Sequence, residues 1–419
     1  MYNYSENAKA QSNSAFQSAA WLTIIGTFTV PLALTAANNI FLSLSVILLL
    51  FTPQIKEYRC LLSANKTALI GTVLFIYLGL SISWANSEIA VSVKYLSKFR
   101  EFLLIPMFML IFAASKQRHA AFTSIYIAML LSLVASYLIH FQIADLSENQ
   151  HSLSNRIYHG ISMSIFAYMS LQLAVRIPSY RWLFALIYCA TLANLFFIEN
   201  GRTGYLLIIS LSALFFWQMF RWRGFAIVAI FIASALTITM WFYNLVELRI
   251  FAEDQSLLTG NSSLSLLNLQ KADQRVEFYL LSTILFLQDW VIGTGLGDFG
   301  PEYLQLHSSM ETYYGQTNNP HNEFLNIGVQ TGIPGVILFS AFLLSLLIKR
   351  DKQAISQQRQ FQAAIFITIL ISCLFNSSFM DHGDGTLFMI LIALFCGSNW
   401  DTPLYKTTEE LISQEQTDR

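Results

Sequence analysis

The sequence predicts an all-α polytopic membrane protein with about twelve transmembrane helices and one large periplasmic helical segment. Of its 419 residues, 55% are hydrophobic and only 12% are charged, and the mean hydropathy is +0.51. The apolar residues also fall in long runs, each near the length that a bilayer requires. Soluble proteins of this size rarely combine these properties. Membrane-spanning helices are therefore expected along most of the chain.

The apolar runs follow one another with short polar connections, except where one long polar segment separates the ninth run from the tenth. In order, the runs cover residues 21–34, 39–51, 68–83, 102–114, 121–141, 161–175, 182–197, 205–220, 225–243, 333–348, 361–379 and 386–396. Short runs such as 102–114 are included because their composition is that of a membrane helix.

The cations indicate which side of the membrane each connection occupies. Loops that alternate from a cytoplasmic N-terminus carry most of them, namely Lys56, Arg59, Lys66, Lys116, Arg118, Arg176, Arg181, Arg221, Arg223, Lys349, Arg350, Lys352 and Arg359. The other short loops hold fewer, namely Lys94, Lys98, Arg100, Arg156 and Arg202. Because cytoplasmic loops are enriched in Lys and Arg, both termini are predicted to be cytoplasmic. The first twenty residues have no compact apolar core, so no cleavable signal peptide is expected.

This register divides the chain into four parts. They are nine transmembrane helices (1–243), a periplasmic segment (244–332), three further transmembrane helices (333–398) and a cytoplasmic tail (399–419). A long external segment in an otherwise tightly connected bundle is expected to be functional.

The periplasmic segment has recognisable local patterns. Residues 245–253 and 272–287 show the apolar spacing of helices, and one face of the second would pack on the bundle or lie in the membrane interface; it comprises Val276, Tyr279, Leu280, Ile284 and Leu287. The closely spaced glycines of 293–297 do not follow a βαβ unit. They predict a tight turn and not a dinucleotide site.

The most polar stretch of this segment, 316–328, is where chemistry is expected. Asn319 suits a helix N-cap and Pro320 the first helical position, which would place His321 in the first turn. The helix dipole there disfavours the imidazolium, so His321 is expected to be neutral and able to accept a proton. The plainer alternative is a polar turn before a membrane helix, with His321 an ordinary surface residue.

Three arginines on the predicted periplasmic side also need an explanation. Arg202 lies in a very short loop, Arg275 opens a helix, and Arg100 begins a membrane run. A guanidinium binds phosphate oxygens in pairs and stays charged, so these residues could hold a phosphate-bearing lipid. The alternatives are contacts with ordinary anionic lipid, or pairing with Glu199 and Glu101. Three arginines together with a histidine favour an anion site.

Metal-dependent chemistry is not expected from these residues. Asp381 and His382, in another short far-side loop, lack a recognised metal-ligand spacing, and the chain has no Asp-x-Asp pair. Nucleotide sugars are cytoplasmic, whereas the candidate residues face the other way. A transferase acting there needs a donor carried across the membrane on a lipid, and a polyprenyl pyrophosphate fits the arginines.

The sequence resembles the O-antigen ligase family, within the wider group that includes O-antigen polymerases and protein O-oligosaccharyltransferases. The resemblance covers the whole topology. Its sharpest motif is Pro320-His321-Asn322-Glu323-Phe324-Leu325, followed by Gly328 and Gly332. Asn200-Gly201-Arg202-Thr203 and Gln274-Arg275 with Tyr279 accompany it.

The resemblance implies a metal-independent, inverting glycosyltransferase without a cofactor. It would move O-antigen polysaccharide from undecaprenyl pyrophosphate to lipid A–core, at the periplasmic face of the inner membrane of a Gram-negative bacterium. His321 matches the essential histidine, Arg202 and Arg275 match the arginines that hold pyrophosphate, and Arg100 matches a cation near the start of an early span. Asn322, Glu323 and Asp381 are expected to support them. Membrane lipid is an expected partner and nucleic acid is not.

Two alternatives stay open. A polymerase or a protein O-oligosaccharyltransferase of the same group would share most of these features, although the His-Asn-Glu motif favours the ligase. A transporter or flippase is a different class that also has many spans. Against it stand the lack of an internal repeat, the few charges within the spans and the single large external segment.

Overall fold

The computed structural model describes residues 14–145, 152–199, 201–221, 223, 274–310, 312–348 and 356–397. Every regular element in these ranges is a helix, which confirms the predicted all-α class. The predicted runs at 225–243 and 245–253 lie outside the described residues.

The helices follow the apolar runs closely. The chain up to His140 forms α2 (Ser14–Thr29), α3 (Thr35–Leu50), η2 (Pro53–Glu57), α4 (Tyr58–Ala64), α5 (Lys66–Leu80), η3 (Ser81–Trp84), α6 (Ile89–Ser97), α7 (Glu101–Ile111) and α8 (Ser115–His140). The rest forms α9 (Arg156–Arg176), η4 (Pro178–Tyr180), α10 (Arg181–Ala193), η5 (Asn194–Ile198), α11 (Arg202–Phe220), α16 (Gln274–Gln288), α17 (Phe299–Ser309), α18 (Glu323–Ser345), α19 (Ser356–Phe375) and α20 (His382–Cys396).

Six helices of the described ranges are long and apolar enough to cross a membrane, or seven if the bent pair Thr35–Leu50 and Pro53–Ala64 forms one span. The six are Lys66–Trp84, Ser115–His140, Pro178–Ile198, Arg202–Phe220, Glu323–Ser345 and Ser356–Phe375. They indicate a multi-pass membrane protein. Most of the other predicted spans in these ranges form shorter helices, such as α7 with 11 residues. The total of about twelve spans therefore stays a prediction.

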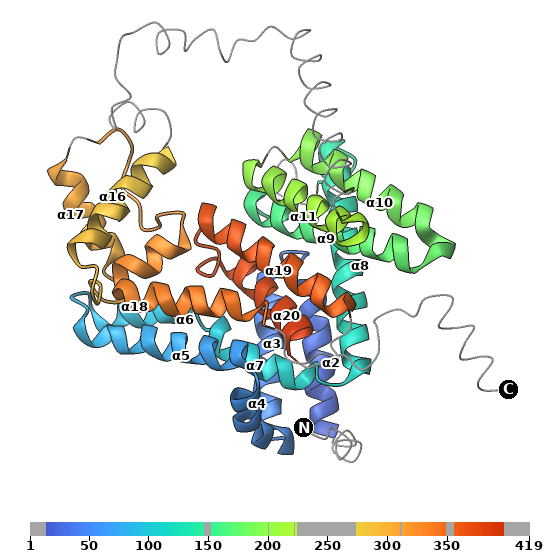
Figure 1. Cartoon of the computed structure of the whole chain (residues 1–419), viewed down its shortest axis with the longest axis horizontal. Coiled ribbons are helices and arrows are strands. Elements are labelled where there is room, and N and C mark those ends of the chain that lie inside the picture. The colour runs from blue at the N-terminus through green and yellow to red at the C-terminus, as the bar shows by residue number, and fades with distance from the viewer. Residues whose placement is uncertain are drawn as a thin grey trace, which may run out of the picture.

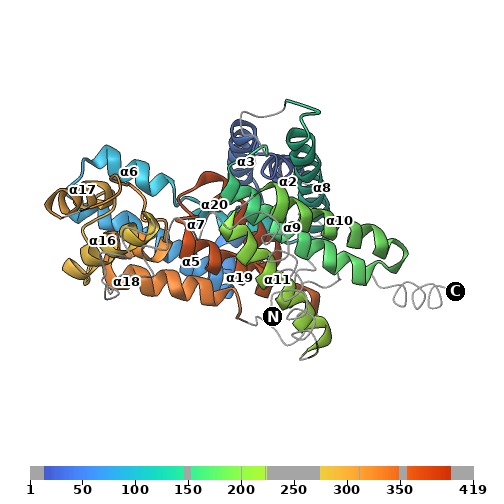
Figure 2. The same cartoon turned by 90° about the horizontal axis from the view of Figure 1, so that it is seen from above.

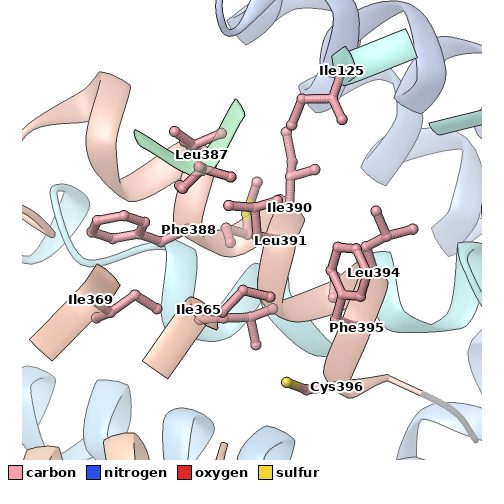
Figure 3. Close-up of a cluster of buried hydrophobic side chains, with 14 of the residues drawn as sticks. Ile125, Ile365, Ile369, Leu387, Phe388, Ile390, Leu391, Leu394, Phe395 and Cys396 are labelled. Carbon is pink, nitrogen blue, oxygen red and sulfur yellow. The ribbon is translucent and has the colours of Figure 1, made fainter. Parts of the chain in front are cut away.

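The helix α20 lies at the centre of the molecule. Every residue from Asp384 to Cys396 is buried, as expected for a helix that is apolar on all sides. Figure 3 shows Leu391 and Phe395 of this helix packed among side chains of neighbouring helices, including Ile365. Burial of α20 fixes the position of its polar N-terminal end, which bears Asp381 and His382.

A second, smaller core joins α16 and α17 to the first half of α18. Its buried members are Phe278, Leu281, Leu285, Phe299, Tyr303 and Val329. In Figures 1 and 2 these three helices lie together at the left of the molecule. Two carboxylates attach the unit to its surroundings: Asp298 accepts from the backbone N–H groups of Asn86 and Ser87, both at 2.7 Å. Glu277 likewise accepts from the N–H of Tyr313 at 2.8 Å.

The buried face of α16 differs from the one expected. Phe278, Leu281 and Leu285 face the core, whereas Val276 and Leu287 of the expected face are 36% and 62% exposed. The prediction that this face packs on the bundle is therefore wrong for Val276 and Leu287. Their location in a membrane interface stays a prediction.

The glycine-rich segment forms the predicted tight turn. Gly293, Gly295 and Gly297 have φ values of 74°, 107° and 105°, which glycine adopts without the steric cost of a side chain. The N–H of Gly295 donates to the carbonyl oxygen of Gln330 at 3.0 Å, so the turn packs directly on α18. At Gly332, where φ is 64° and ψ is −164°, α18 is broken into two helical halves. This break coincides with the predicted boundary between periplasmic segment and membrane helix.

Candidate active site

The segment between α19 and α20, residues 376–381, is the centre of the candidate site; we call it the hub loop. Residues 376–380 of this loop are buried. The ring of Phe379 lies 4.6 Å from that of Phe102 in α7 and 5.6 Å from that of Phe388 in α20, between centroids. The predicted membrane run 361–379 therefore ends early, at Phe375, because the hub loop turns inward to pack on α7, α18 and α20.

The start of α18 contacts the end of α19 through Asn322 and the hub loop through Glu323. The Asn322 side chain caps the helix by accepting from the N–H of Leu325 at 3.0 Å, and its amide nitrogen donates to the carbonyl oxygen of Leu374 at 3.1 Å. Glu323 is fully buried and accepts from the N–H of Phe379 at 2.8 Å. The two residues expected to support the site thus fix the end of α19 and the hub loop to the start of α18.

The expected N-cap was wrong. Asn322 is the cap and not Asn319, so His321 precedes the helix and does not lie in its first turn. Asn319 instead accepts from the backbone N–H of His321 at 2.8 Å. A side chain that bonds the backbone two residues on forms a local turn, and this turn competes successfully with helix formation at Pro320.

His321 is held from several directions. Its φ is 54°. The Phe278 ring stacks on the imidazole with 5.9 Å between centroids and 17° between planes. The Tyr279 hydroxyl donates to the carbonyl oxygen of His321 at 3.1 Å. Half-burial together with these contacts gives the imidazole a defined orientation, which a plain surface histidine does not need.

The hub loop also contacts the imidazole itself. Nδ1 of His321 lies 3.2 Å from Oδ1 of Asn376, and the amide nitrogen of Asn376 donates to Oδ2 of Asp381 at 2.8 Å. Asn376 was not predicted from the sequence. The polar run Asn-Ser-Ser at 376–378 was the available signal, but it was assigned to a membrane run.

Arg100, at the N-cap of α7, extends to the residue that follows the hub loop. Its Nη2 lies 2.9 Å from Nδ1 of His382 and donates to Oδ1 of Asn39 at 3.0 Å. Its Nε is 3.7 Å from Oε1 of the buried Glu101, so the expected pairing with Glu101 is present. His382 directly follows Asp381, and Arg100 therefore lies beside the hub loop.

Arg275 is placed near His321 by the helix that carries it. It is the second residue of α16, and residues three and four apart share a helix face. Phe278 and Tyr279, which contact His321, therefore lie on the same side of α16 as the half-buried Arg275.

The packing of Phe278 is itself secured by Tyr303, whose ring lies 6.1 Å away edge to face. Burial raises the pKa of the Tyr303 phenol, and the nearby Glu277 carboxylate raises it further. The phenol therefore stays neutral at ordinary pH, so the side chain of α17 that packs on Phe278 carries no charge.

Arg202 lies on a neighbouring helix end. It is exposed at the start of α11, where α11 crosses α9 so closely that a Cβ on Gly160 would lie 3.2 Å from Cα of Gly204. The first turn of α9 packs against the first turn of α20, because a Cβ on Gly383 would lie 3.2 Å from the Tyr158 ring. The place of Arg202 in a pyrophosphate site therefore stays a prediction.

The other expected site residues lie in or near the hub loop. Asn322, Glu323, Asp381 and Arg100 contact the hub loop or lie next to a residue that does, and Arg275 lies on the adjoining turn of α16. Glu199, which was expected to pair with Arg202, pairs with Arg156: Nε of Arg156 lies 3.9 Å from Oε2 of Glu199.

These helix ends define one region of the molecule. The N-terminal ends of α7, α9, α16, α18 and α20 are linked by the contacts described above, and each carries an arginine, a histidine or both nearby. Helix N-termini bear partial positive charge, so the region suits an anionic group. A histidine fixed beside it can exchange protons with a bound substrate.

Comparison with known proteins agrees with this location. A protein-family model described as O-antigen ligase matches residues 187–340, a region that includes Arg202, Arg275, His321, Asn322 and Glu323. Arg100, Asn376 and Asp381 lie outside it. No curated protein matches the chain significantly. Residues 187–340 of the chain therefore match the O-antigen ligase family, as the motifs of the sequence predicted.

Proposed function

We propose that this protein is an O-antigen ligase. It transfers polysaccharide from undecaprenyl pyrophosphate to lipid A–core at the periplasmic face of the inner membrane. The observation that carries the proposal is the position of His321: within the family domain, fixed at the start of α18, and beside helix ends that bear Arg100 and Arg275. A base next to a cationic cluster is what transfer from a diphosphate requires.

His321 acts as the general base. It takes the proton of the acceptor hydroxyl as that oxygen bonds to the anomeric carbon of the donor. The carbon–oxygen bond to the pyrophosphate breaks, and its electron pair leaves with undecaprenyl pyrophosphate. Attack opposite the leaving group inverts the anomeric centre. A positioned base typically contributes about 10²–10⁴-fold to such a step.

The arginines stabilise the leaving group. Negative charge grows on the pyrophosphate as the bond breaks, and fixed cations aimed at that charge lower the barrier. Arg202 and Arg275 bind the phosphates, and Arg100 adds a third positive charge. Guanidinium groups in these places do the work that Mg²⁺ does in many transferases, so the reaction is proposed to need no metal.

Positioning supplies a further part of the rate. Both substrates are scarce lipids, and holding them together converts their encounter into an effectively intramolecular step. The α16–α17 unit, attached through Asp298 and Glu277, forms one wall of the region in which they would meet.

The test is the lipopolysaccharide of a strain that lacks this gene, separated by size on a gel. Loss of a ligase leaves bare core while polymer accumulates on the carrier; loss of a polymerase leaves core capped with single repeats. The first pattern is expected, and the second would replace the ligase proposal by the polymerase.

The same strain tests the histidine. His321→Ala should insert normally yet leave bare core, because the base is missing, whereas the wild-type gene restores capped lipopolysaccharide. Normal capping by His321→Ala would remove His321 from the mechanism.

A further inference from the structure

We propose that Asn376 is a positioning residue for His321, and that Asp381 fixes the orientation of Asn376. The three side chains form a relay that sets which imidazole nitrogen faces the substrate. This inference rests on the proposed function, since it gives His321 the role of base.

The orientation of the Asn376 amide follows from its other partner. A carboxylate offers no hydrogen, so the group that faces Oδ2 of Asp381 at 2.8 Å must be the NH₂ of Asn376. The amide oxygen then points the other way, toward Nδ1 of His321 at 3.2 Å. Asp381 thereby decides which end of the amide His321 meets.

The tautomer of His321 follows in turn. An amide oxygen only accepts, so Nδ1 must carry the hydrogen and Nε2 must hold the lone pair. Nε2 is therefore the nitrogen that can take a proton. The bond from Nδ1–H to Asn376 is kept when the ring becomes an imidazolium, which stabilises the product of proton transfer.

The relay is built into the buried part of the protein. Asn376 is 1% exposed, and it follows directly on the end of α19, where the carbonyl oxygen of Leu374 accepts from the Asn322 amide at 3.1 Å. The end of α19 thus contacts the N-cap of α18 through its backbone, and the next residue, Asn376, contacts His321 just before that cap. This places the amide within a fixed distance of the imidazole.

Other titratable groups face the hub loop, and the relay must be separated from them experimentally. They are Glu101 of α7, Glu323 of α18, and His382 and Asp384 of α20. None of these contacts the His321 ring in the hydrogen bonds described. Because Asn376 also faces Asp384, a variant of Asn376 alone does not isolate the relay, and the exchange of Asn376 and Asp381 described below does.

The experiment compares four variants in a purified transfer assay with lipid-linked donor and lipid A–core. Asn376→Leu removes the acceptor at similar volume, so kcat should fall about 10²-fold or more, as when a catalytic histidine loses its orienting partner. KM for both lipids should change less than twofold, because the relay does not touch them. Asn376→Asp alone faces Asp381 with a second carboxylate and should also lower kcat.

The decisive variant exchanges the two groups. In Asn376→Asp/Asp381→Asn the introduced amide donates to the introduced carboxylate, and that carboxylate accepts the Nδ1–H of His321. The kcat should recover at least tenfold relative to Asn376→Asp. Lack of recovery would overturn the relay, because a correct amide–carboxylate pair would then be present without effect.

A matched control is Asn326→Leu. Asn326 is an equally buried amide near the hub loop, bonded to Glu323 at 3.1 Å and to the sulfur of Met380, but it does not contact His321. Its loss should lower the midpoint of thermal unfolding more than kcat. An equal loss of kcat in Asn326→Leu and Asn376→Leu would reduce Asn376 to a structural role.

Failure of the inference is distinguishable from failure of the proposed function. Full kcat in Asn376→Leu beside an inactive His321→Ala would refute the relay and leave the base in place. Activity in His321→Ala would refute both.

Discussion

At the scale of single residues, the conformation of His321 stands out. A φ of 54° lies in the left-handed region, which few residues other than glycine adopt, although histidine is among the more tolerant ones. Such a conformation costs on the order of 1 kcal/mol and persists only where neighbours impose it. Asn319 and Tyr279 do so through the backbone of His321. The conformational cost therefore falls on the residue whose imidazole must keep one orientation.

Arg275→Lys tests whether the arginines recognise phosphate by shape as well as by charge. An ammonium keeps the charge but cannot bond two phosphate oxygens in parallel. A lost charge-assisted hydrogen bond of about 1.5–3 kcal/mol predicts a kcat/KM about tenfold to a hundredfold lower, measured in the transfer assay. Arg359→Lys, at the exposed start of α19, is the control and should be unchanged. Wild-type activity in Arg275→Lys would argue against paired bonds.

Single residues also mark the limit of prediction from sequence. His321, Arg275 and Asn322 could be selected because motif and side chain point to chemistry. Asn376 could not, because its contact with His321 joins residues 55 positions apart, and nothing local predicts it. The N-cap was misplaced by three residues since Asn319 and Asn322 are equally good caps in isolation. Only the turn at Asn319 decides between them.

At the scale of elements, the two halves of α18 on either side of Gly332 have different roles. Its first half carries Glu323 and packs with α16, while its second half continues as an apolar helix. Gly332 adopts φ 64° and ψ −164°, a region that essentially only glycine occupies. A Cβ there would also lie 2.5 Å from the carbonyl oxygen of Val291.

Gly332→Ala is therefore expected to destabilise the protein by about 1–3 kcal/mol or more and to lower activity by displacing the start of α18. The midpoint of thermal unfolding in detergent and the transfer rate would measure both effects. Gly79→Ala is the matched control within α5, because its Cβ meets only Leu96 at an ordinary 3.6 Å. If both variants unfold at the same temperature, the break at Gly332 carries no conformational demand.

Helices such as α5, α8 and α11 could be placed from sequence because their apolar runs have the length of a span. The face of α16 could not. In a membrane protein, apolar side chains face lipid as well as protein, so hydropathy does not tell the core side from the outside. Phe278 and Leu281 face inward while Leu287 is exposed, and only the packing of α17 and α18 decides this.

At the scale of the whole molecule, the proposal depends on the side of the membrane that the site faces. Alkaline phosphatase, which is active only outside the cytoplasm, can be inserted after Gly315, where a Cβ would meet nothing within 4 Å. High phosphatase activity is expected there, and none after Lys352, which the charge register assigns to the cytoplasm. The reverse pattern would end the periplasmic assignment.

Independence from metal is a second property proposed for the whole reaction. With arginines as the counter-charge to pyrophosphate, the initial transfer rate should change less than twofold in excess EDTA. The control is a sample with Mg²⁺ added back. An absolute requirement for Mg²⁺ would contradict the role given to the guanidinium groups.

The crossing of α9 and α11 has a consequence for how such a site could be adjusted. Gly160 and Gly204 meet backbone to backbone, with no side chain acting as a spacer between the helices. Arg156 and Arg202 begin these two helices, so the distance between them is set by main-chain contact. A methyl group added to either glycine would act as a wedge, spreading the two guanidinium groups without altering any charge. The separation of the two guanidinium groups at the α9–α11 crossing can thus be changed independently of their charge.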